Sequence, residues 1–438
     1  MSAPRLVPPL VAIAVAIAMT GCSRADEPVR VGILTECSGL FAPTAPGALA
    51  GAALPLLDRG ARKGDSTGEV GNARVAGRRV ELIPGCTGAT EFSQLIAETR
   101  WLVESRGADV VVGPLGTPDG FVVRELARRY PDVTFIAGSG VAQKLTLEDP
   151  QPNLFRLTPD GAQIVAGLGA YAFEELGWRR AVVVTEAYTN GWEITAGFVA
   201  EFCALGGQIV ERDYASLFSS NPTPAAKRHA ATSDGVAILT TAIPATGYIA
   251  AYATALGAPL MQHLVLSGPP FYDPSTIAPP GVDTSGVVIG GFVPLDPADQ
   301  AMSRFRGALE DAYPELAASV ATQDPTLSSY AAVEAIASAL EATNGELGEA
   351  QSELRHALSR LELDLPYGPV HLDANRQAVT RNSLEQLRRG ANGRAEARLL
   401  SHVDTVEQGF GGLFDADTPA PSWNEPACER RAPPPWAR

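Results

Sequence analysis

The sequence predicts an α/β protein built from two similar units, and three observations lead to this prediction. Short apolar runs rich in Val and Ile alternate with stretches of helical periodicity, which is typical of doubly wound parallel sheets. The alternation restarts once, after about residue 160. The chain has 438 residues, and a single core rarely grows past about 250–300 residues, so two domains are expected.

The first unit alternates strands with helices in a regular series. Four β-branched apolar runs are predicted to be buried parallel strands: 29–36, 78–85, 108–114 and 133–138. A helix is predicted over 89–107, where Phe92, Leu95 and Leu102 recur at helical spacing and Gly107 ends the pattern. A second helix is predicted over 121–130.

The second unit repeats the alternation. Asp160 is predicted to cap a helix over 161–177, and a further helix is predicted over 191–207. The predicted strands are 180–187, 208–214, 235–242, 263–268 and 286–293. Two later stretches, 327–342 and 348–361, have helical periodicity, and 366–379 has the pattern of a turn and a strand. After about Gly412 the chain becomes rich in proline and irregular.

Two α/β units in one chain suggest a cleft between them. Ligands of open α/β sheets bind outside the carboxyl ends of the strands. That rule selects the residues that directly follow 29–36, 108–114, 133–138, 180–187, 235–242 and 263–268.

The N-terminus has the order of an export signal. Arg5 precedes an apolar run that ends at Met19, and this run is interrupted by prolines and too short to span a bilayer. The sequence Gly21-Cys22 then resembles a bacterial lipobox. This resemblance implies a signal peptide over 1–21, a lipidated Cys22 and a tether over 22–28. The alternative is an ordinary signal peptide with an incidental cysteine.

Composition and motifs exclude several classes of function. The net charge of −15 is opposed to nucleic-acid binding. We find no nucleophile elbow, HExxH, P-loop or CxxC motif and no His/Cys spacing for a metal, so no cofactor or metal is predicted. An exported enzyme with paired carboxylates remains an alternative, because that chemistry needs no motif. Besides Cys22, four cysteines allow three disulfide pairings.

An ordered set of segments resembles one family. The segments VRVGILTECSGLFA, ADVVVGPLGT, VTFIAGSGVAQKLT, NLFRLTPDGAQ, RRAVVVTEAYTNGWEITAGFVAEFCALGGQIV and PYGPVHLDANRQA occur in the order found in solute-binding proteins of branched-chain-amino-acid-type ABC transporters. The resemblance covers roughly residues 29 to 385. It implies the type I periplasmic binding protein fold: two flavodoxin/Rossmann-like lobes with parallel sheets, joined by a three-crossover hinge.

The resemblance also implies domain boundaries and partners. Lobe one is expected over 29–158 plus 293–365, lobe two over 159–292 plus 366–412, and an irregular tail over 413–438. The crossovers would lie near Thr158, Phe292 and Tyr367. We expect a monomer that is anchored by lipid to the outer face of the bacterial cell membrane and delivers a small solute to an ABC permease. In this topology the first two strands are neighbours, which favours the disulfides Cys37–Cys86 and Cys203–Cys428.

The family pattern, carried over by position, gives a candidate ligand set. Members that bind amino acids hold the carboxylate with hydroxyls and backbone N–H groups of lobe one and the ammonium with an acid of lobe two. The corresponding loops here supply twelve candidate residues: Ser38, Phe41, Gly116, Thr117, Ser139, Gly140, Tyr188, Asn190, Trp192, Ala242, Gly268 and Phe271. The loop that carries the family's glutamate has no acid before Asp273.

The missing acid shapes the ligand hypothesis. A buried ammonium without a partner costs several kcal/mol, roughly enough to reject α-amino acids. We therefore expect a ligand without an α-amino group: an amide, a carboxylate or an aromatic metabolite. The alternative is an amino-acid ligand held by another acid, for which Glu36, Glu186 or Asp119 are candidates. A third possibility is a sensory protein, since the same fold serves as a receptor ectodomain.

Overall fold

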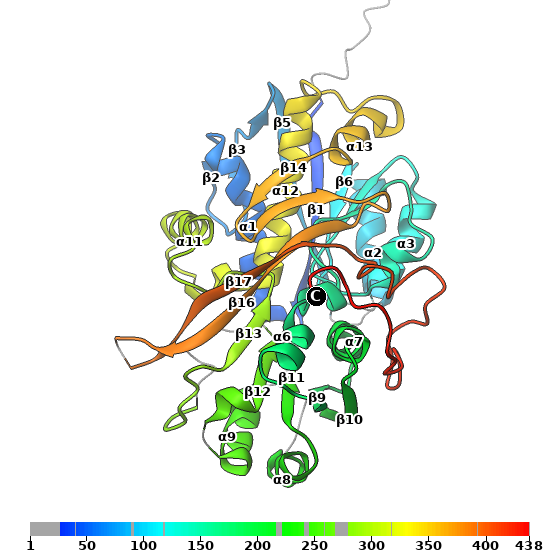
Figure 1. The fold of residues 1–438 in the computed structure, drawn as a ribbon. Helices are drawn as coiled ribbons and strands as arrows, with labels where there is room; N and C mark the ends of the chain where they lie inside the picture. The colour runs from blue at the N-terminus through cyan, green and yellow to red at the C-terminus, as the bar shows by residue number, and fades with distance from the viewer. Residues whose placement is uncertain are drawn as a thin grey trace, which may run out of the picture.

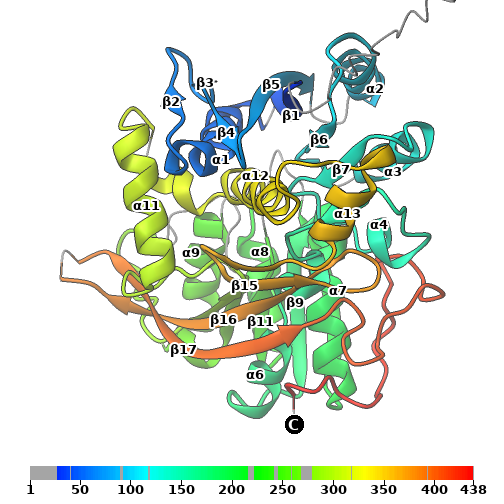
Figure 2. The same cartoon turned by 90° about the horizontal axis from the view of Figure 1, so that it is seen from above.

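The fold consists of two α/β bodies, as predicted. A computed structural model describes residues 27–39, 41–88, 92–116, 119–215, 221–240, 245–257, 259–267, 279–316, 318–391 and 393–437. In Figure 1 one body, containing β1 and α12, lies above a second body that contains β9 and α7. Figure 2 shows the same arrangement from above.

The first body is built on a six-stranded sheet in the order β4-β5-β1-β6-β7-β8. Its strands are β1 (Val29–Ser38), β4 (Arg74–Val75), β5 (Arg78–Gly88), β6 (Val110–Val112), β7 (Thr134–Ala137) and β8 (Leu154–Arg156). Its helices are α1 (Ala45–Asp58), α2 (Phe92–Arg100), α3 (Asp119–Arg129), α4 (Lys144–Leu147), α11 (Gln300–Ala312), α12 (Asp324–Ala342) and α13 (Ser352–Leu358). A small ribbon, β2 (Arg62–Lys63) with β3 (Val70–Gly71), stands apart from the sheet.

The second body is built on a nine-stranded sheet in the order β10-β9-β11-β12-β13-β16-β15-β14, with β17 paired to β16. Its strands are β9 (Arg180–Glu186), β10 (Gln208–Ala215), β11 (Gly235–Ile238), β12 (Leu264–Ser267), β13 (Val288–Gly291), β14 (Glu362–Leu365), β15 (Gly368–Leu372), β16 (Ala378–Arg389) and β17 (Ala395–Val406). Its helices are α5 (Gly161–Ile164), α6 (Leu168–Glu174), α7 (Thr189–Ala204), α8 (Thr223–Thr232) and α9 (Ala245–Leu256).

Two predicted helices differ in detail from those observed. Asp160 caps α5 as predicted, because its side chain accepts the N–H of Gln163 in a capping box. The helix predicted over 161–177 is divided, however, since Gly167 adopts φ 96° between α5 and α6. The helix predicted over 89–107 ends as a π-helical turn, Trp101–Ser105.

Three chain segments meet at the junction of the two bodies. The Tyr367 hydroxyl donates to the carbonyl oxygen of Leu157 at 2.9 Å, and its ring packs edge-on against Phe292 with centroids 5.3 Å apart. These residues lie at or beside the three expected crossovers. The lobe boundaries remain a proposal, and the one at 365 falls at the turn of the antiparallel pair β14–β15.

A buried polar network holds this junction. Arg156 is fully buried, and its guanidinium lies 3.8 Å from the carboxylate of Asp160. Gln408 donates to the same carboxylate at 2.9 Å, and Gln377 donates to the carbonyl of Thr158 at 3.0 Å. Breaking a buried ion pair costs about 3–5 kcal/mol. The network therefore holds the chain between β8 and α5, where it passes from the first body into the second.

Candidate ligand cleft between the lobes

The candidate cleft lies where the strands of both sheets end. Strands β1, β6 and β7 point their carboxyl ends at one wall, and β9, β11 and β12 point theirs at the other. Four of the twelve candidate residues lie outside the described residues: Thr117, Ala242, Gly268 and Phe271. The other eight can be placed.

Glu36 organises the wall formed by the first body. It is 2% exposed, and its Oε1 accepts the N–H groups of Leu115 at 3.0 Å and Gly116 at 3.1 Å. Burial raises the pKa of Glu36 to about 7, and nearby Asp119 adds to the rise against the effect of these hydrogen bonds. The carboxyl of Glu36 therefore shapes the loop that contains Gly116, which is buried.

Asp119, the first residue of α3, lies against this loop. A Cβ at Gly116 would be 2.2 Å from Oδ2 of Asp119, so a larger residue there would require the Asp119 side chain to shift. Asp119 is 1% exposed, and its Oδ1 has no hydrogen-bond partner among the described residues. Burial raises the pKa of Asp119 to about 6.

The first turn of α7 forms the opposite wall. Tyr188 is the N-cap of this helix, and Asn190 and Trp192 follow in its first turn; all three side chains are partly exposed. Burial raises the pKa of Tyr188 to about 12, and the charges of Asp119, Glu36 and Glu186 add to this rise. Acids of both bodies therefore influence the pKa of one tyrosine.

Several polar groups on the walls lack protein partners. Among the described residues, no hydrogen-bond partner is found for the hydroxyls of Tyr188 and Ser139 or for Nε1 of Trp192. Ser139 is 6% exposed. The next residue, Gly140, is also buried, and its carbonyl accepts a long hydrogen bond from Arg156 at 3.5 Å. The unpaired groups come from both bodies, as expected for a site that closes on a polar ligand.

Ser38 and Phe41 lie at the rim of the first wall. Ser38 is the last residue of β1 and is exposed. Phe41 is partly buried, and its carbonyl accepts the hydroxyl of Thr44 at 2.8 Å. These two residues are therefore placed beside the cleft rather than at its base.

One contact between the walls was missed by sequence reasoning. Glu193 in α7 is 2% exposed, and its Oε2 accepts the N–H of Gln143 at 3.0 Å across the junction. Burial raises the pKa of Glu193 to about 8. The available signal was an acidic residue next to the largely apolar run Ile194–Phe198 of this helix.

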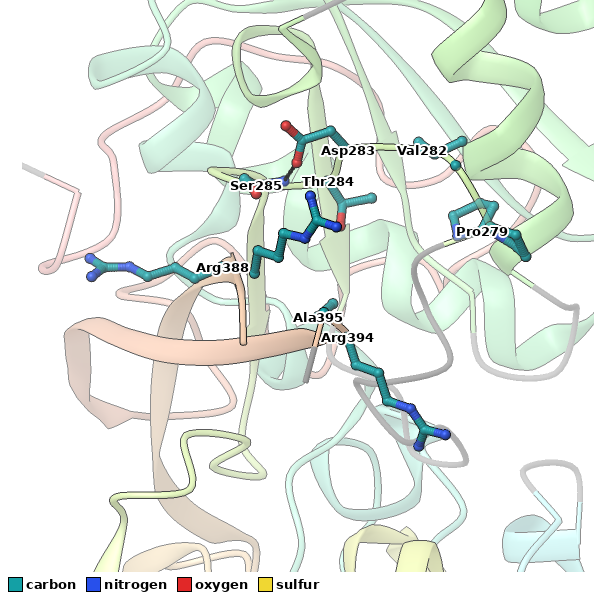
Figure 3. A pocket seen from close by; sticks show the side chains of 12 residues that line it. Pro279, Val282, Asp283, Thr284, Ser285, Arg388, Arg394 and Ala395 are labelled. Carbon is teal, nitrogen blue, oxygen red and sulfur yellow. Dashed lines mark hydrogen bonds between the residues drawn. The ribbon is translucent and has the colours of Figure 1, made fainter. Parts of the chain in front are cut away.

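Two other hollows lie at the opposite edges of the sheets. One of about 340 Å³ is lined by Asp283, Ser285 and arginines of the β16–β17 turn, before β13 begins; Figure 3 shows Arg394 pointing away from Asp283. The other, about 730 Å³, is lined by Glu27, Arg78 and Asp109, just before β1, β5 and β6 begin. Among the parallel strands, the first lies at the amino end of β13 and the second at the amino ends of β1, β5 and β6, so neither is the expected cleft.

Two disulfides are present in the structure, and they join the pairs that the family topology favoured. Cys37 is bonded to Cys86 and Cys203 to Cys428. The first links neighbouring strands β1 and β5 beside Glu36. The second attaches the C-terminal segment to α7.

Within the described ranges, no set of three or more His, Cys, Asp or Glu residues is placed to hold a metal ion. No described helix combines the length and apolarity needed to cross a membrane. Cys22 and the signal segment lie outside the described residues.

The fold and the opposed walls define a two-lobed solute-binding protein. A model of the periplasmic binding protein family matches residues 28–390, and the chain belongs to this family. The resemblance inferred from the sequence motifs, to solute-binding proteins of ABC transporters with the type I fold, is thereby confirmed.

Known proteins with the same fold come from several bacteria. The chain is 22% identical over 381 residues to the Leu/Ile/Val-binding protein homolog 6 of Brucella suis, covering 85% of this chain and 90% of the relative. An ABC transporter substrate-binding protein from Sphaerobacter thermophilus has a TM-score of 0.73 at 24% identity, covering 87% of this chain and 99% of that one. A solute-binding protein from Rhodopseudomonas palustris HaA2, solved with p-hydroxybenzoic acid, has a TM-score of 0.71 at 17% identity, covering 87% and 98%.

Proposed function

We propose that this chain is the lipid-anchored, extracytoplasmic receptor of an ABC importer. It captures a small organic solute between its two lobes and delivers it to a membrane permease. The proposal rests on family membership and on one structural observation. Buried polar groups without protein partners occur on both walls, namely the hydroxyls of Tyr188 and Ser139 and Nε1 of Trp192.

The energetics of these groups favour a ligand between them. A buried polar group without a hydrogen-bond partner costs about 1–3 kcal/mol. A solute that supplies partners to groups on both lobes removes part of this cost only when the lobes are closed. Such differential binding is what shifts a hinged protein toward its closed state.

The proposed ligand lacks an α-amino group, and it is an amide, a carboxylate or an aromatic metabolite. The loop that carries the family's ammonium-binding acid has none before Asp273. In this proposal Glu36 serves the first wall instead, where its Oε1 accepts the N–H groups of Leu115 and Gly116. Structural neighbours from Rhodopseudomonas palustris were solved with 4-hydroxybenzoate and benzoate, which have no amine.

One observation favours a second candidate, an amino-acid ligand. Asp119 is buried, its Oδ1 lacks a described partner, and its charge acts on Tyr188. An ammonium placed between Asp119 and Tyr188 would satisfy this oxygen. A structural neighbour from Streptococcus pneumoniae, with a TM-score of 0.64, was solved with isoleucine.

The two candidates are separated by a titration series on the chain from Ser23 onward. Benzoate, 4-hydroxybenzoate, benzamide, leucine, isoleucine and valine are titrated calorimetrically at pH 7. Binding of solutes without an amine, and no binding of the amino acids, supports the first candidate. Binding of the amino acids that is abolished by Asp119→Asn supports the second.

A variant pair tests whether the cleft is the binding site. Tyr188→Phe removes one hydroxyl from the wall and should weaken binding about threefold to tenfold, the value of one net hydrogen bond. Tyr171→Phe is the matched control, because Tyr171 lies on α6, away from the strand ends. Equal affinities for both variants and the parent would contradict the assignment of the site.

A further inference from the structure

The C-terminal strap, defined here as residues 413–437, covers helix α7. It lies beyond residues 28–390, which match the family model. In both views the strap, drawn in red, runs beside α7 (Figures 1 and 2).

Helix α7 is covered on nearly all sides, since 13 of its 16 residues are buried. The strap is bonded to this helix through Cys203–Cys428. Further along the strap, Nε1 of Trp436 donates to Oε1 of Glu201 at 2.6 Å.

Both ends of the strap are held by contacts with residues outside it. Its first turn accepts hydrogen bonds from Lys144, whose Nζ lies 2.7 Å from the carbonyl oxygen of Ala416. Near its other end, the ring of Trp436 packs edge-on against Phe410, which directly precedes the strap, with centroids 5.1 Å apart. Because both ends are held, the middle of the strap is kept beside α7.

Trp423, in the middle of the strap, reaches the start of α7. Its ring centroid lies 6.1 Å from that of Trp192 and 4.3 Å from that of Tyr214 in β10. The Tyr214 hydroxyl donates to the carbonyl oxygen of Trp423 at 3.1 Å. Strand β10 therefore holds Trp423 against the first turn of the helix.

The first turn of α7 lacks a side-chain cap. The first N–H groups of a helix have no partner further along the helix, and the N-cap residue, Tyr188, makes no side-chain capping hydrogen bond, although its carbonyl oxygen accepts the N–H groups of Gly191 and Trp192. This turn nevertheless carries Tyr188, Asn190 and Trp192, three residues of the candidate cleft. Binding geometry must be held within about 0.5 Å to be productive.

We propose that Trp423 is a positioning residue for the ligand site. By packing on Trp192 it holds the first turn of α7 in the conformation that presents Tyr188 and Asn190 to the solute. The inference rests on the proposed function for its effect on binding, but its structural effect exists without any ligand. Each part therefore has its own measurement.

Hydrogen–deuterium exchange of the ligand-free chain from Ser23 onward tests the structural part. Trp423→Ala should raise the exchange rate of amides 189–193 tenfold or more and leave amides 196–204 protected. Tyr214→Phe, which removes the anchor of Trp423, should have the same effect to a smaller degree. Trp436→Phe, the matched control at the far end of the strap, should leave 189–193 unchanged. Unchanged exchange of 189–193 in Trp423→Ala would overturn the proposal.

Titration with 4-hydroxybenzoate tests the functional part, followed by any solute of the calorimetric series that binds the parent. Trp423→Ala should raise the dissociation constant fivefold or more, while Trp436→Phe should leave it unchanged. Equal dissociation constants for the parent and Trp423→Ala would refute the positioning role. If no solute binds the parent, the proposed ligand class fails, and the exchange rates still decide whether Trp423 orders the first turn of α7.

Discussion

Asp324 carries an unpaired buried carboxyl whose removal should stabilise the protein. It is the first residue of α12 and is 3% exposed. Its Oδ1 has no hydrogen-bond partner among the described residues, and burial raises the pKa of Asp324 from 3.8 to about 8. The perturbation is Asp324→Asn, which keeps the shape and removes the ionisation.

The magnitude follows from the linkage between proton binding and folding. Below pH 3.8 both states hold the proton. Above it the unfolded state releases its proton first, so the free energy of unfolding falls by about 1.4 kcal/mol per pH unit until the folded pKa is reached. By pH 7 this loss amounts to about 4 kcal/mol. The protonated carboxyl of the parent and the amide of the variant both leave a buried group unpaired, so this cost largely cancels, and a gain of up to about 4 kcal/mol is expected at pH 7.

Urea unfolding of the parent and Asp324→Asn between pH 4 and pH 8 measures this gain. The variant should be more stable at pH 7, and its advantage should disappear toward pH 4. Asp296→Asn is a control in which the change in stability should have the opposite sign. Burial disfavours the charge of Asp296, but hydrogen bonds from Leu399 and Ala298 lower its pKa overall. That control should be less stable than the parent at pH 7. An Asp324→Asn variant with unchanged or lower stability at pH 7 would refute the reasoning.

Three further predictions concern the cysteines. Replacing Cys37 and Cys86 by serine should lower the free energy of unfolding by up to about 4 kcal/mol on the loop-entropy model, measured by urea unfolding; an unchanged midpoint would contradict it. Replacing Cys203 and Cys428, which close a separation of 225 residues, should cost up to about 5 kcal/mol by the same measurement. Cys22→Ser should abolish incorporation of radiolabelled palmitate and release the protein from the membrane fraction, and continued labelling would exclude the anchor.

Much of the fold could be predicted from the sequence because most of its strands have a recognisable local pattern. Runs such as 29–36 and 180–187 are continuous and apolar, as buried parallel strands are. The long hairpin of β16 and β17 was not foreseen, although Gly390 and Gly393 flank its turn. Several of its buried residues are polar, and one of them has a distant partner: Glu385 accepts the N–H of Leu295 at 3.0 Å. Such pairing across 90 residues leaves no local pattern.

The candidate site was predicted in part for a similar reason. The carboxyl-end rule selects Tyr188 and the loop of Gly116 without knowledge of the tertiary structure. The hydrogen bonds of Glu36, by contrast, join loops that are 79 and 80 residues away. The predicted disulfide Cys203–Cys428 tied the tail to helix α7, but Trp423 was missed because no local pattern in a proline-rich segment indicates which of its side chains contacts that helix. Local periodicity identifies elements, whereas these contacts depend on the assembled topology.

The most direct test of the account is the calorimetric comparison of 4-hydroxybenzoate, benzamide and leucine on the chain from Ser23 onward, in parallel with Tyr188→Phe. The account predicts that a solute without an amine binds, that Tyr188→Phe weakens this binding about threefold to tenfold, and that leucine does not bind. Tight binding of leucine that is insensitive to Tyr188→Phe would contradict both the proposed ligand class and the proposed cleft.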